Sequence, residues 1–330
     1  SIDSGISVIN SYISKKINLS HCKAIIISEE LASKGVSDVV YTLINNIETR
    51  PDCNVIISKC AASDFLENSS PIFESNPANY YELILNSTEY SGYVADLTLS
   101  NFYANIVSTT SEACAILGSI NTEETHGSDN DKNSSLDGNY KASQTPIESK
   151  NKNSIENMGT AVFSGDKLVG ELDNIETLCY LIVTNKLENA TITIPNPFNL
   201  NSTVALYVRL NKDTQNKVSF VNGYPFIECD VSIAGDILSL DGSIDLTNSN
   251  NVDMLNSYVN KYLEDIINSY LYKTSKEFKA DISNFGKYVL PQYATWNEWI
   301  ASDWLNNYQN AFFKVTVDTK LQGSYLFTKI

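Results

Sequence analysis

Residues 159–172 read Gly159-Thr-Ala-Val-Phe-Ser-Gly-Asp-Lys-Leu-Val-Gly-Glu-Leu172, and Asp173-Asn-Ile-Glu176 and an apolar segment from Thr177 to Val183 follow directly. Two short runs of strand-forming residues flank a Ser-Gly-Asp-Lys turn, which predicts a β-hairpin. Asp173 and Glu176 have the spacing of a capping box, in which each side chain bonds the backbone N–H of the other residue. The stretch therefore predicts a hairpin followed at once by a helix.

The same stretch resembles the motif that opens the C-terminal region of the Ger(x)C family, the lipoprotein subunits of spore nutrient germinant receptors. A second segment, His21-Cys-Lys-Ala-Ile-Ile-Ile-Ser-Glu-Glu-Leu-Ala-Ser-Lys-Gly35, resembles a strand-to-helix segment of that family. A third, Cys229-Asp-Val-Ser-Ile-Ala-Gly-Asp-Ile-Leu238, is similar to a late family strand that precedes a long helix. The three motifs occur in the family's order and cover nearly the whole chain.

Composition and charge limit the classes of partner. The chain has 330 residues, of which 42% are hydrophobic and 19% charged, as is ordinary for a globular protein of two or three domains. The net charge is −16, and Arg50 and Arg209 are the only arginines. Nucleic-acid binding needs clustered Lys and Arg, so we expect no nucleic-acid partner. An acidic chain is also repelled by an anionic membrane surface.

The first 121 residues predict a mixed α/β region. Cys22 to Ile27 has the length and apolarity of a strand buried on both faces, and Asn54 to Ser58 returns as a second strand. Two helices lie between them: Ser28 is a candidate N-cap of the first, Gly35 ends it, and Ser37 is a candidate cap of the second. Because the helices form a crossover, we expect the two strands to be parallel.

The pattern alternates again along the rest of this region. We expect helices near Ala61 to Glu67, from Pro77 to Tyr90 and from Ser100 to about Val107, with a strand from Val94 to Leu99. The adjacent Glu29 and Glu30 point in different directions on a helix, so they fit a role at the helix N-terminus better than one as a catalytic acid–base pair.

Residues 122–157 are rich in Gly, Ser, Asn, Asp and Lys, which predicts a polar linker or long loop between residues 1–121 and 158–330. The run from Asp129 to Tyr140 hints at an EF-hand loop. The sixth position is Ser134 instead of Gly and the twelfth is Tyr140 instead of Glu, so we expect no calcium site.

The C-terminal residues 158–330 predict an antiparallel sheet packed against a long helix, which makes the fold class α+β. After the opening hairpin and helix, apolar residues alternate with polar ones as in a half-buried sheet. A helical stripe then extends to Ile282. The four predicted strands are Ala190 to Ile194, Thr203 to Leu210, Val218 to Val221 and Ile227 to Ala234, and the helix is Val252 to Ile282.

The tail carries Trp296, Trp299 and Trp304 ahead of an alternating strand from Phe312 to Leu321. Clustered tryptophans can form a sugar-binding or membrane platform, but we favour a role in closing the end of the core.

Catalytic and metal-binding patterns are missing from the sequence. His21 and His126 are the only histidines, and there is no Gly-x-Ser-x-Gly elbow, P-loop or dinucleotide fingerprint, so we expect no enzyme, no cofactor, no metal site and no catalytic residues. The six cysteines show no zinc-like spacing and are expected to be buried and reduced, although the spacing leaves one disulfide open. The full list is Cys22, Cys53, Cys60, Cys114, Cys179 and Cys229.

The resemblance implies a non-catalytic lipoprotein subunit of a spore nutrient germinant receptor. Such a subunit is needed for the assembly and stability of the receptor and for germination signalling. Its expected partners are the membrane-spanning receptor subunits. It also implies that the full-length protein is held on the outer face of the spore inner membrane by a lipid anchor. We expect this chain to lack that anchor and to be a soluble fragment. The alternative is a module that itself binds the germinant. No binding residues are evident, and a carboxylate clamp has only Arg50 and Arg209 to draw on.

Overall fold

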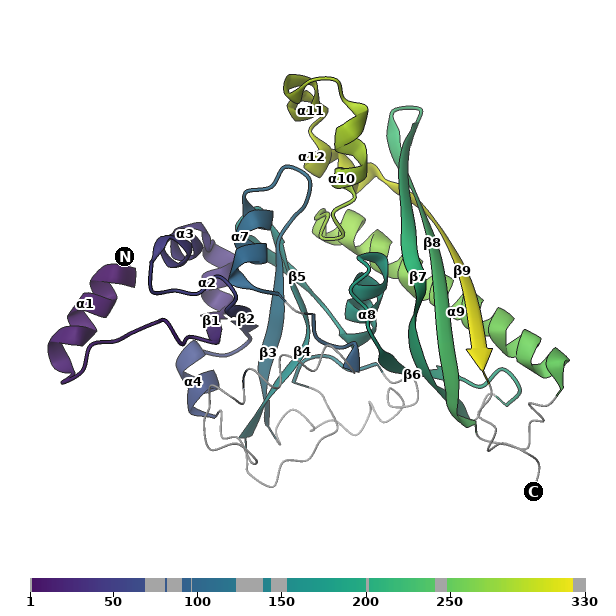
Figure 1. Ribbon diagram of the computed structural model, residues 1–330, viewed down its shortest axis with the longest axis horizontal. Coiled ribbons are helices and arrows are strands. Elements are labelled where there is room, and N and C mark those ends of the chain that lie inside the picture. Colours follow the sequence, from purple (N-terminus) through teal and green to yellow (C-terminus); the bar gives the residue numbers. More distant parts are fainter. Residues whose placement is uncertain are drawn as a thin grey trace.

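The computed structural model describes residues 2–68, 81, 91–95, 97–122, 139–143, 153–199, 202–240 and 248–322. Two β-sheets lie on either side of a short helix, α8 (Asn174–Val183), and a long helix, α9 (Ser249–Tyr272), crosses the second sheet (Figure 1). The α+β class expected from the sequence is confirmed.

The first sheet has five strands in the order β1-β2-β3-β4-β5. The strands β1 (Ala24–Ser28), β2 (Asn54–Ser58) and β3 (Cys114–Thr122) run parallel, as the crossover argument predicts for the first two. The strands β4 (Asn153–Ser164) and β5 (Lys167–Leu172) complete it as the predicted hairpin, antiparallel to β3. The sheet therefore combines strands from both sides of the segment expected to be a linker.

Successive residues of this sheet enter two different cores. Val55 and Ile57 face the helices α2 (Glu29–Lys34), α3 (Ser37–Asn45) and α7 (Leu99–Ile106), whereas Ile56 between them joins the cluster around α8. Both faces of the inner strands are thus covered, which explains why β2 is a continuous apolar run. A further helix, α4 (Ala62–Glu67), follows β2, and α1 (Ile2–Tyr12) lies next to α3 at the margin of the molecule (Figure 1).

Three expectations for this region are wrong. Within the described residues, Val94 to Leu99 is not a strand, and only Thr98 forms a β-bridge, with Asn54. The Thr98 side chain caps α7, so the helix begins at Leu99, the last residue of this run. The N-cap of α3 is Val36, without a side-chain bond, and not Ser37. Asn153 to Asn157 belongs to β4 and not to a loop.

Other parts of the N-terminal prediction hold, and one central element was missed. Ser28 caps α2, Gly35 ends it at φ 125°, and the helices near Ala61 and Ser100 are present. The strand β3, at the centre of the sheet, was not predicted. The helix expected from Pro77 to Tyr90 and most of the expected linker lie outside the described residues.

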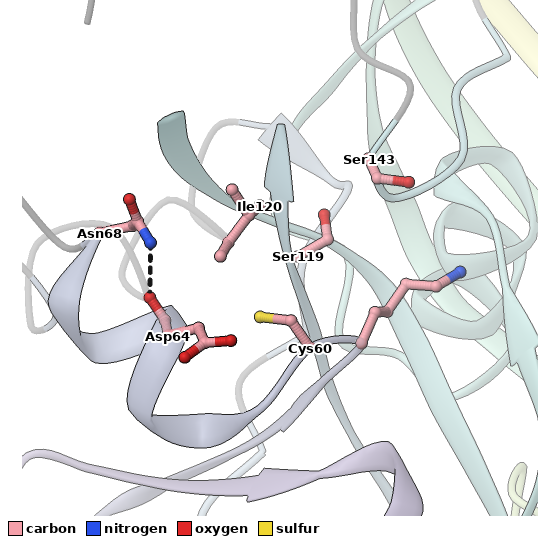
Figure 2. Close-up of a pocket in the computed structure, with 7 residues that line it drawn as sticks. Cys60, Asp64, Asn68, Ser119, Ile120 and Ser143 are labelled. Carbon is pink, nitrogen blue, oxygen red and sulfur yellow. Dashed lines mark hydrogen bonds between the residues drawn. The ribbon is translucent and has the colours of Figure 1, made fainter. Parts of the chain in front are cut away.

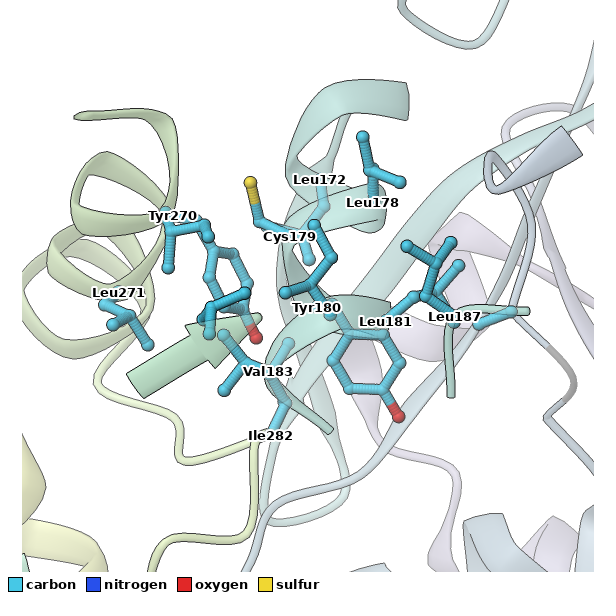
Figure 3. Close-up of a cluster of buried hydrophobic side chains, with 14 of the residues drawn as sticks. Leu172, Leu178, Cys179, Tyr180, Leu181, Val183, Leu187, Tyr270, Leu271 and Ile282 are labelled. Carbon is cyan, nitrogen blue, oxygen red and sulfur yellow. The ribbon is translucent and has the colours of Figure 1, made fainter. Parts of the chain in front are cut away.

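The capping box that starts α8 is confirmed. The Asp173 carboxylate accepts the backbone N–H of Glu176 at 2.8 Å, and the Glu176 carboxylate accepts that of Asp173 at 3.0 Å. Every residue of α8 except Glu176 is buried, as expected for a helix that is apolar on all sides. Figure 3 shows its side chains packed against Tyr270 and Leu271 of α9.

The other end of α8 is capped from the second sheet. The Thr214 hydroxyl donates to the carbonyl oxygen of Ile182 at 2.8 Å, and the Asn216 amide donates to that of Val183 at 2.9 Å. Thr214 lies in an irregular stretch of β7, where the register shifts between Leu210 and Gln215, and Asn216 directly follows that stretch. Backbone carbonyls that would otherwise be buried without partners at the helix end are thereby satisfied.

The second sheet has the order β6-β7-β8-β9, formed by β6 (Ala190–Pro195), β7 (Thr203–Val221), β8 (Tyr224–Leu240) and β9 (Phe312–Gln322). The strands expected at Thr203 to Leu210 and Val218 to Val221 are one strand, because the polar residues between them are accommodated by the irregular register. Pairing is antiparallel from β6 to β8, but β9 is parallel to β8 because α9 forms a crossover between them.

The long helix α9 packs on this sheet as expected, but it ends ten residues before the predicted Ile282, at Tyr272. A π-helical turn, η3 (Lys273–Phe278), follows and is closed by Lys279 in the left-handed conformation at φ 55°. Burial resumes after this turn, since Ala280 and Ile282 are buried although they lie outside any helix.

The tail forms short helices that close one end of the core, namely α10 (Gly286–Val289), η4 (Leu290–Gln292), α11 (Trp296–Ser302), α12 (Trp304–Asn307) and η5 (Tyr308–Asn310). Trp299 and Trp304 are buried, in agreement with the core-closing role, whereas Trp296 is 60% exposed.

Candidate functional site

A pocket of about 370 Å³ opens beyond the carboxyl end of the parallel strand β2. Open α/β sheets commonly bind ligands at this end of their strands. The chain leaves β2 through Lys59 and Cys60 and enters α4, so side chains from the connection, the helix and the neighbouring strand β3 converge there. Figure 2 shows them around the pocket, which Lys59, Cys60, Asp64, Asn68, Ser119, Ile120 and Ser143 line.

The pocket wall carries several polar groups, which specific bonds hold in place. The Cys60 thiol lies 3.2 Å from the Ser58 hydroxyl, and the Asn68 amide donates to the carbonyl oxygen of Asp64 at 2.8 Å (Figure 2). The Asp64 carboxylate and the Cys60 thiol face the same space. The wall therefore offers a negative charge, hydroxyls and a thiol to a small polar molecule.

Glu156 of β4 supports the pocket from behind. One of its carboxylate oxygens accepts the Ser119 hydroxyl at 3.0 Å and also accepts the backbone N–H of Ser143. Ser143 has φ 73°, in the left-handed region. This carboxylate thus connects β3, β4 and the segment 139–143, three parts of the chain that are far apart in the sequence.

A chain of charged groups extends from the pocket to α8 and α9. The Lys59 ammonium lies 2.8 Å from the carboxylate of Glu171 on β5. The carbonyl oxygen of Glu171 accepts a bond from Lys273 at 3.1 Å, and Lys273 contacts both carboxylate oxygens of Glu176 at 2.8 and 2.7 Å. These groups border a second cavity of about 120 Å³. The pocket is thereby joined electrostatically to the capping box.

A pair of buried carboxylates joins the first sheet to the tail. The Asp281 carboxylate is fully buried and accepts three bonds, from the backbone N–H groups of Phe285 and Gly286 at 3.1 and 3.0 Å and from the indole of Trp304 at 2.9 Å. The Asp281 carbonyl accepts the backbone N–H of Glu112 at 2.9 Å. The Glu112 carboxylate accepts the N–H of Gly165 at the tip of the β4–β5 hairpin, at 2.7 Å.

Burial changes the pKa of both carboxyls of this joint. Loss of hydration raises the pKa of Glu112 to about 7 against the bond from Gly165, and the nearby Asp281 raises it further. Loss of hydration also raises the pKa of Asp281 to about 6, although its three donors act in the opposite direction. Gly286 is required here, since a Cβ at that position would lie 2.3 Å from the carbonyl oxygen of Thr110.

The glutamates and arginines that the sequence analysis singled out lie outside the pocket. Glu29 and Glu30 occupy the first turn of α2, as expected. Arg50 pairs with Asp52 at 2.6 Å and Arg209 with Asp236 at 3.1 Å, both on the surface and away from the pocket. His21 is exposed, and His126 and most of the rejected calcium loop lie outside the described residues. Among the described residues, no three His, Cys, Asp or Glu side chains gather as metal ligands would.

Both parts of the chain match known spore germination domains. Residues 1–122 match the spore germination protein N-terminal domain, and residues 158–325 match the family described as spore germination B3/GerAC like, C-terminal. The chain belongs to this GerAC-like family. The Ger(x)C resemblance of its three motifs is thereby confirmed.

Two bacterial relatives align with most of this GerAC-like chain. The spore germination protein GerQC of Bacillus cereus is 20% identical over 93% of the chain and 76% of its own length. The putative spore germination protein YfkR of Bacillus subtilis (strain 168) is 22% identical over 96% of the chain and 75% of its own length.

The fold of the GerAC-like chain is also found in a solved structure. The crystal structure of the GerBC protein superimposes with a TM-score of 0.62 over 91% of this chain and 79% of GerBC, at 15% identity. At this identity the likeness concerns the fold. Within the described ranges, no helix has both the length and the apolarity that crossing a bilayer requires.

Sequence reasoning did not find the pocket or the buried joint of this GerAC-like protein. Cys60, Ser119 and Glu156 are ordinary residues in three separate segments, and only the pairing of β2, β3 and β4 brings them together. For Asp281 a faint signal exists, because an acidic residue interrupts an apolar stripe that stays buried on both sides. Such a residue indicates a buried acceptor with several donors.

Proposed function

We propose that this protein is a non-catalytic subunit of a spore nutrient germinant receptor, where it supports the assembly of the membrane-spanning subunits and passes on the germination signal. We further propose that it acts on the outer face of the spore inner membrane, held there by a lipid anchor. The observation that carries the proposal is the match of both parts of the chain, in order, to spore germination domains. The resemblance stated above supplies the receptor context.

The chemistry of the described residues supports a non-catalytic role. None of the residues that line the pocket is a histidine, the residue that most often activates a serine or thiol nucleophile. The Ser119 hydroxyl donates to the Glu156 carboxylate, which also accepts the backbone N–H of Ser143 and so joins three segments of the chain. The buried carboxylates Glu112 and Asp281 bond backbone and indole groups inside a joint, which fits them for holding two parts of the protein together.

The test is made in spores from which the gene is deleted. We expect the abundance of the membrane-spanning subunits in spore membranes to fall several-fold by quantitative immunoblot, and the response to nutrients to be lost. Complementation with the wild-type gene restores both. Unchanged abundance together with a lost response would contradict an assembly role and point to sensing.

The pocket favours a second candidate function, the binding of the germinant itself. About 370 Å³ is enough for a small molecule, and the wall presents a carboxylate, a thiol and hydroxyls together. We would titrate the purified chain with amino acids and sugars by calorimetry. The sensor function predicts saturable heat that Asp64→Asn abolishes. Glu67→Gln, an exposed residue of the same helix that does not line the pocket, should leave it unchanged.

A flat titration with a chain that circular dichroism shows to be folded leaves the scaffold as the function. A second comparison separates the two in spores: a scaffold carrying Asp64→Asn supports normal germination, whereas a sensor carrying it loses the response while the other subunits remain abundant.

A further inference from the structure

Two cysteines lie side by side where β1, at the edge of the first sheet, and its neighbour β2 begin. Cys22 precedes β1 by two residues and Cys53 directly precedes β2. The strands are already paired at this point, since the N–H of Asn54 donates to the carbonyl oxygen of Lys23 at 3.0 Å and Ala24 is in register with Asn54. Paired strands lie about 4.8 Å apart, and disulfides join Cα atoms about 4.4 to 6.8 Å apart.

Both sulfur atoms contact the same short backbone segment. The Cys53 thiol donates to the carbonyl oxygen of Cys22 itself at 2.9 Å, and the Cys22 thiol donates to that of Ala24 at 3.2 Å. The Cys53 side chain is therefore held against the residue it would bridge. No other two of the six cysteines, all of which lie in described ranges, make such a contact.

The two thiols differ in pKa and in exposure, as thiol–disulfide exchange requires of an attacking and a resolving thiol. A hydrogen bond from Cys53 lowers the pKa of Cys22 to about 7, and the same interaction together with burial raises the pKa of Cys53. Cys22 is partly exposed, whereas Cys53 is buried. The lowered pKa and the partial exposure make Cys22 the attacking thiol of the pair, and Cys53 is a protected thiol beside it.

We propose that Cys22 and Cys53 form a reversible dithiol–disulfide site that fastens the outer strand β1 to β2. The oxidant is a low-molecular-weight disulfide. The Cys22 thiolate attacks one of its sulfur atoms, which forms a mixed disulfide and releases one thiolate. Cys53 then loses its proton to solvent and attacks the Cys22 sulfur, which forms the intramolecular bond and releases the second thiolate. The two cysteines lose two electrons, and the small disulfide gains them as two thiols.

The position of the bond gives it a structural consequence. It would close the unit β1–α2–α3–β2 at its open end and anchor β1, which within the described part of the chain has a strand partner on one side only. Reduction would leave β1 held by its ladder with β2 and by its packing against α2 and α4. The site therefore sets how firmly the outer edge of the first sheet is held.

The test uses the purified chain and oxidised glutathione at pH 7, followed by acid quenching, alkylation and peptide mapping by mass spectrometry. We expect a link between the peptides of Cys22 and Cys53 with the mass of two hydrogens lost. Relative to an ordinary thiol, Cys22 should react about threefold faster, because roughly fifteenfold more thiolate is offset by roughly fivefold lower nucleophilicity. Cys53→Ser should trap glutathione on Cys22, and Cys22→Ser should prevent reaction at Cys53.

Cys60→Ser is the matched control, since Cys60 is also partly exposed and follows β2, but bonds Ser58 and not a cysteine. It should form the link as the wild type does. The proposal is overturned if folded wild-type protein keeps glutathione on Cys22 without forming the link. It is also overturned if the link forms equally fast in urea-unfolded chain, because the fold would then contribute nothing.

Discussion

The two sheets of this GerAC-like protein differ in whether the backbone groups of an edge strand are hydrogen-bonded. On the second sheet, the backbone N–H groups of Val317, Thr319 and Leu321 on the edge strand β9 donate to side chains of α9. On the first sheet, β1 pairs with β2 and, among the described residues, its outer side contacts no other strand. Unpaired edge groups are available to another chain. The β9 edge of the second sheet is thus closed against strand addition, and the β1 edge of the first is open to it.

The closed edge depends on matched spacings. The acceptors on α9 are Asn256, Asn260 and Glu264, which are four residues or about 6 Å apart along a helix. Alternate residues of a strand advance by about 6.6 Å, so each helical turn meets one outward N–H group. The open region, in contrast, contains the polar pocket and the cysteine pair. The second sheet thus has its β9 edge bonded to α9, whereas the pocket and the cysteine pair lie on the first sheet.

The largest expected effect comes from breaking the joint between the two regions. Asp281→Ala leaves three buried donors without an acceptor, and each costs about 1–3 kcal/mol, in part offset by removing a buried carboxylate. We expect a loss of about 3 kcal/mol or more in the free energy of unfolding, measured by urea titration. Asp318→Asn, on the exposed side of β9, is the control and should change stability little. An Asp281→Ala variant as stable as the control would show that the two regions are not coupled through this carboxylate.

A smaller effect is expected from the pH dependence of the same joint. The pKa of Glu112 is raised in the folded state from its ordinary 4.5 to about 7, so the folded chain binds more protons than the unfolded chain between these values. Stability contributed by the protonated carboxyl is therefore lost as pH rises from about 4.5 to about 7. Glu112→Gln should reduce this loss and leave the part due to Asp281. Urea midpoints at several pH values measure it, with Glu67→Gln as control; identical pH profiles for wild type and Glu112→Gln would disprove this assignment.

The smallest expected effect concerns the protected edge. Asn260→Ala removes the acceptor of the Thr319 N–H, and the loss of one such bond costs about 1 kcal/mol. Hydrogen exchange of the Thr319 amide should become faster. Asn268→Ala, on the same helix but bonded to Glu264 within α9, should not change it. Equal exchange in both variants would mean that packing, and not the side-chain ladder, protects β9.

Prediction from the sequence succeeded where the signal is local. Asp173 and Glu176 are three residues apart, so their capping box could be read without the fold, and the alternation of residues from Phe312 onward predicted β9. Prediction failed where contacts with residues distant in the sequence determine the local structure. Thr203 to Val221 is one strand because the polar residues inside it cap α8. The described residues from Val94 to Leu99 form no strand because Thr98 starts a helix. The direction of β9 was predictable in principle, since a long helix between two strands gives a parallel crossover.

By itself the sequence determined the hairpin and helix at residues 159–183, the order of the main elements and the kinship with spore germination proteins, because caps, periodicity and motifs act between near neighbours. Only the tertiary structure decided the pocket at β2, the buried pair Glu112 and Asp281, and the contact of Cys22 with Cys53. Each of these joins segments brought together by strand pairing or by burial. Their chemistry depends on proximity in space and on loss of hydration. Neither can be inferred from the order of residues along the chain.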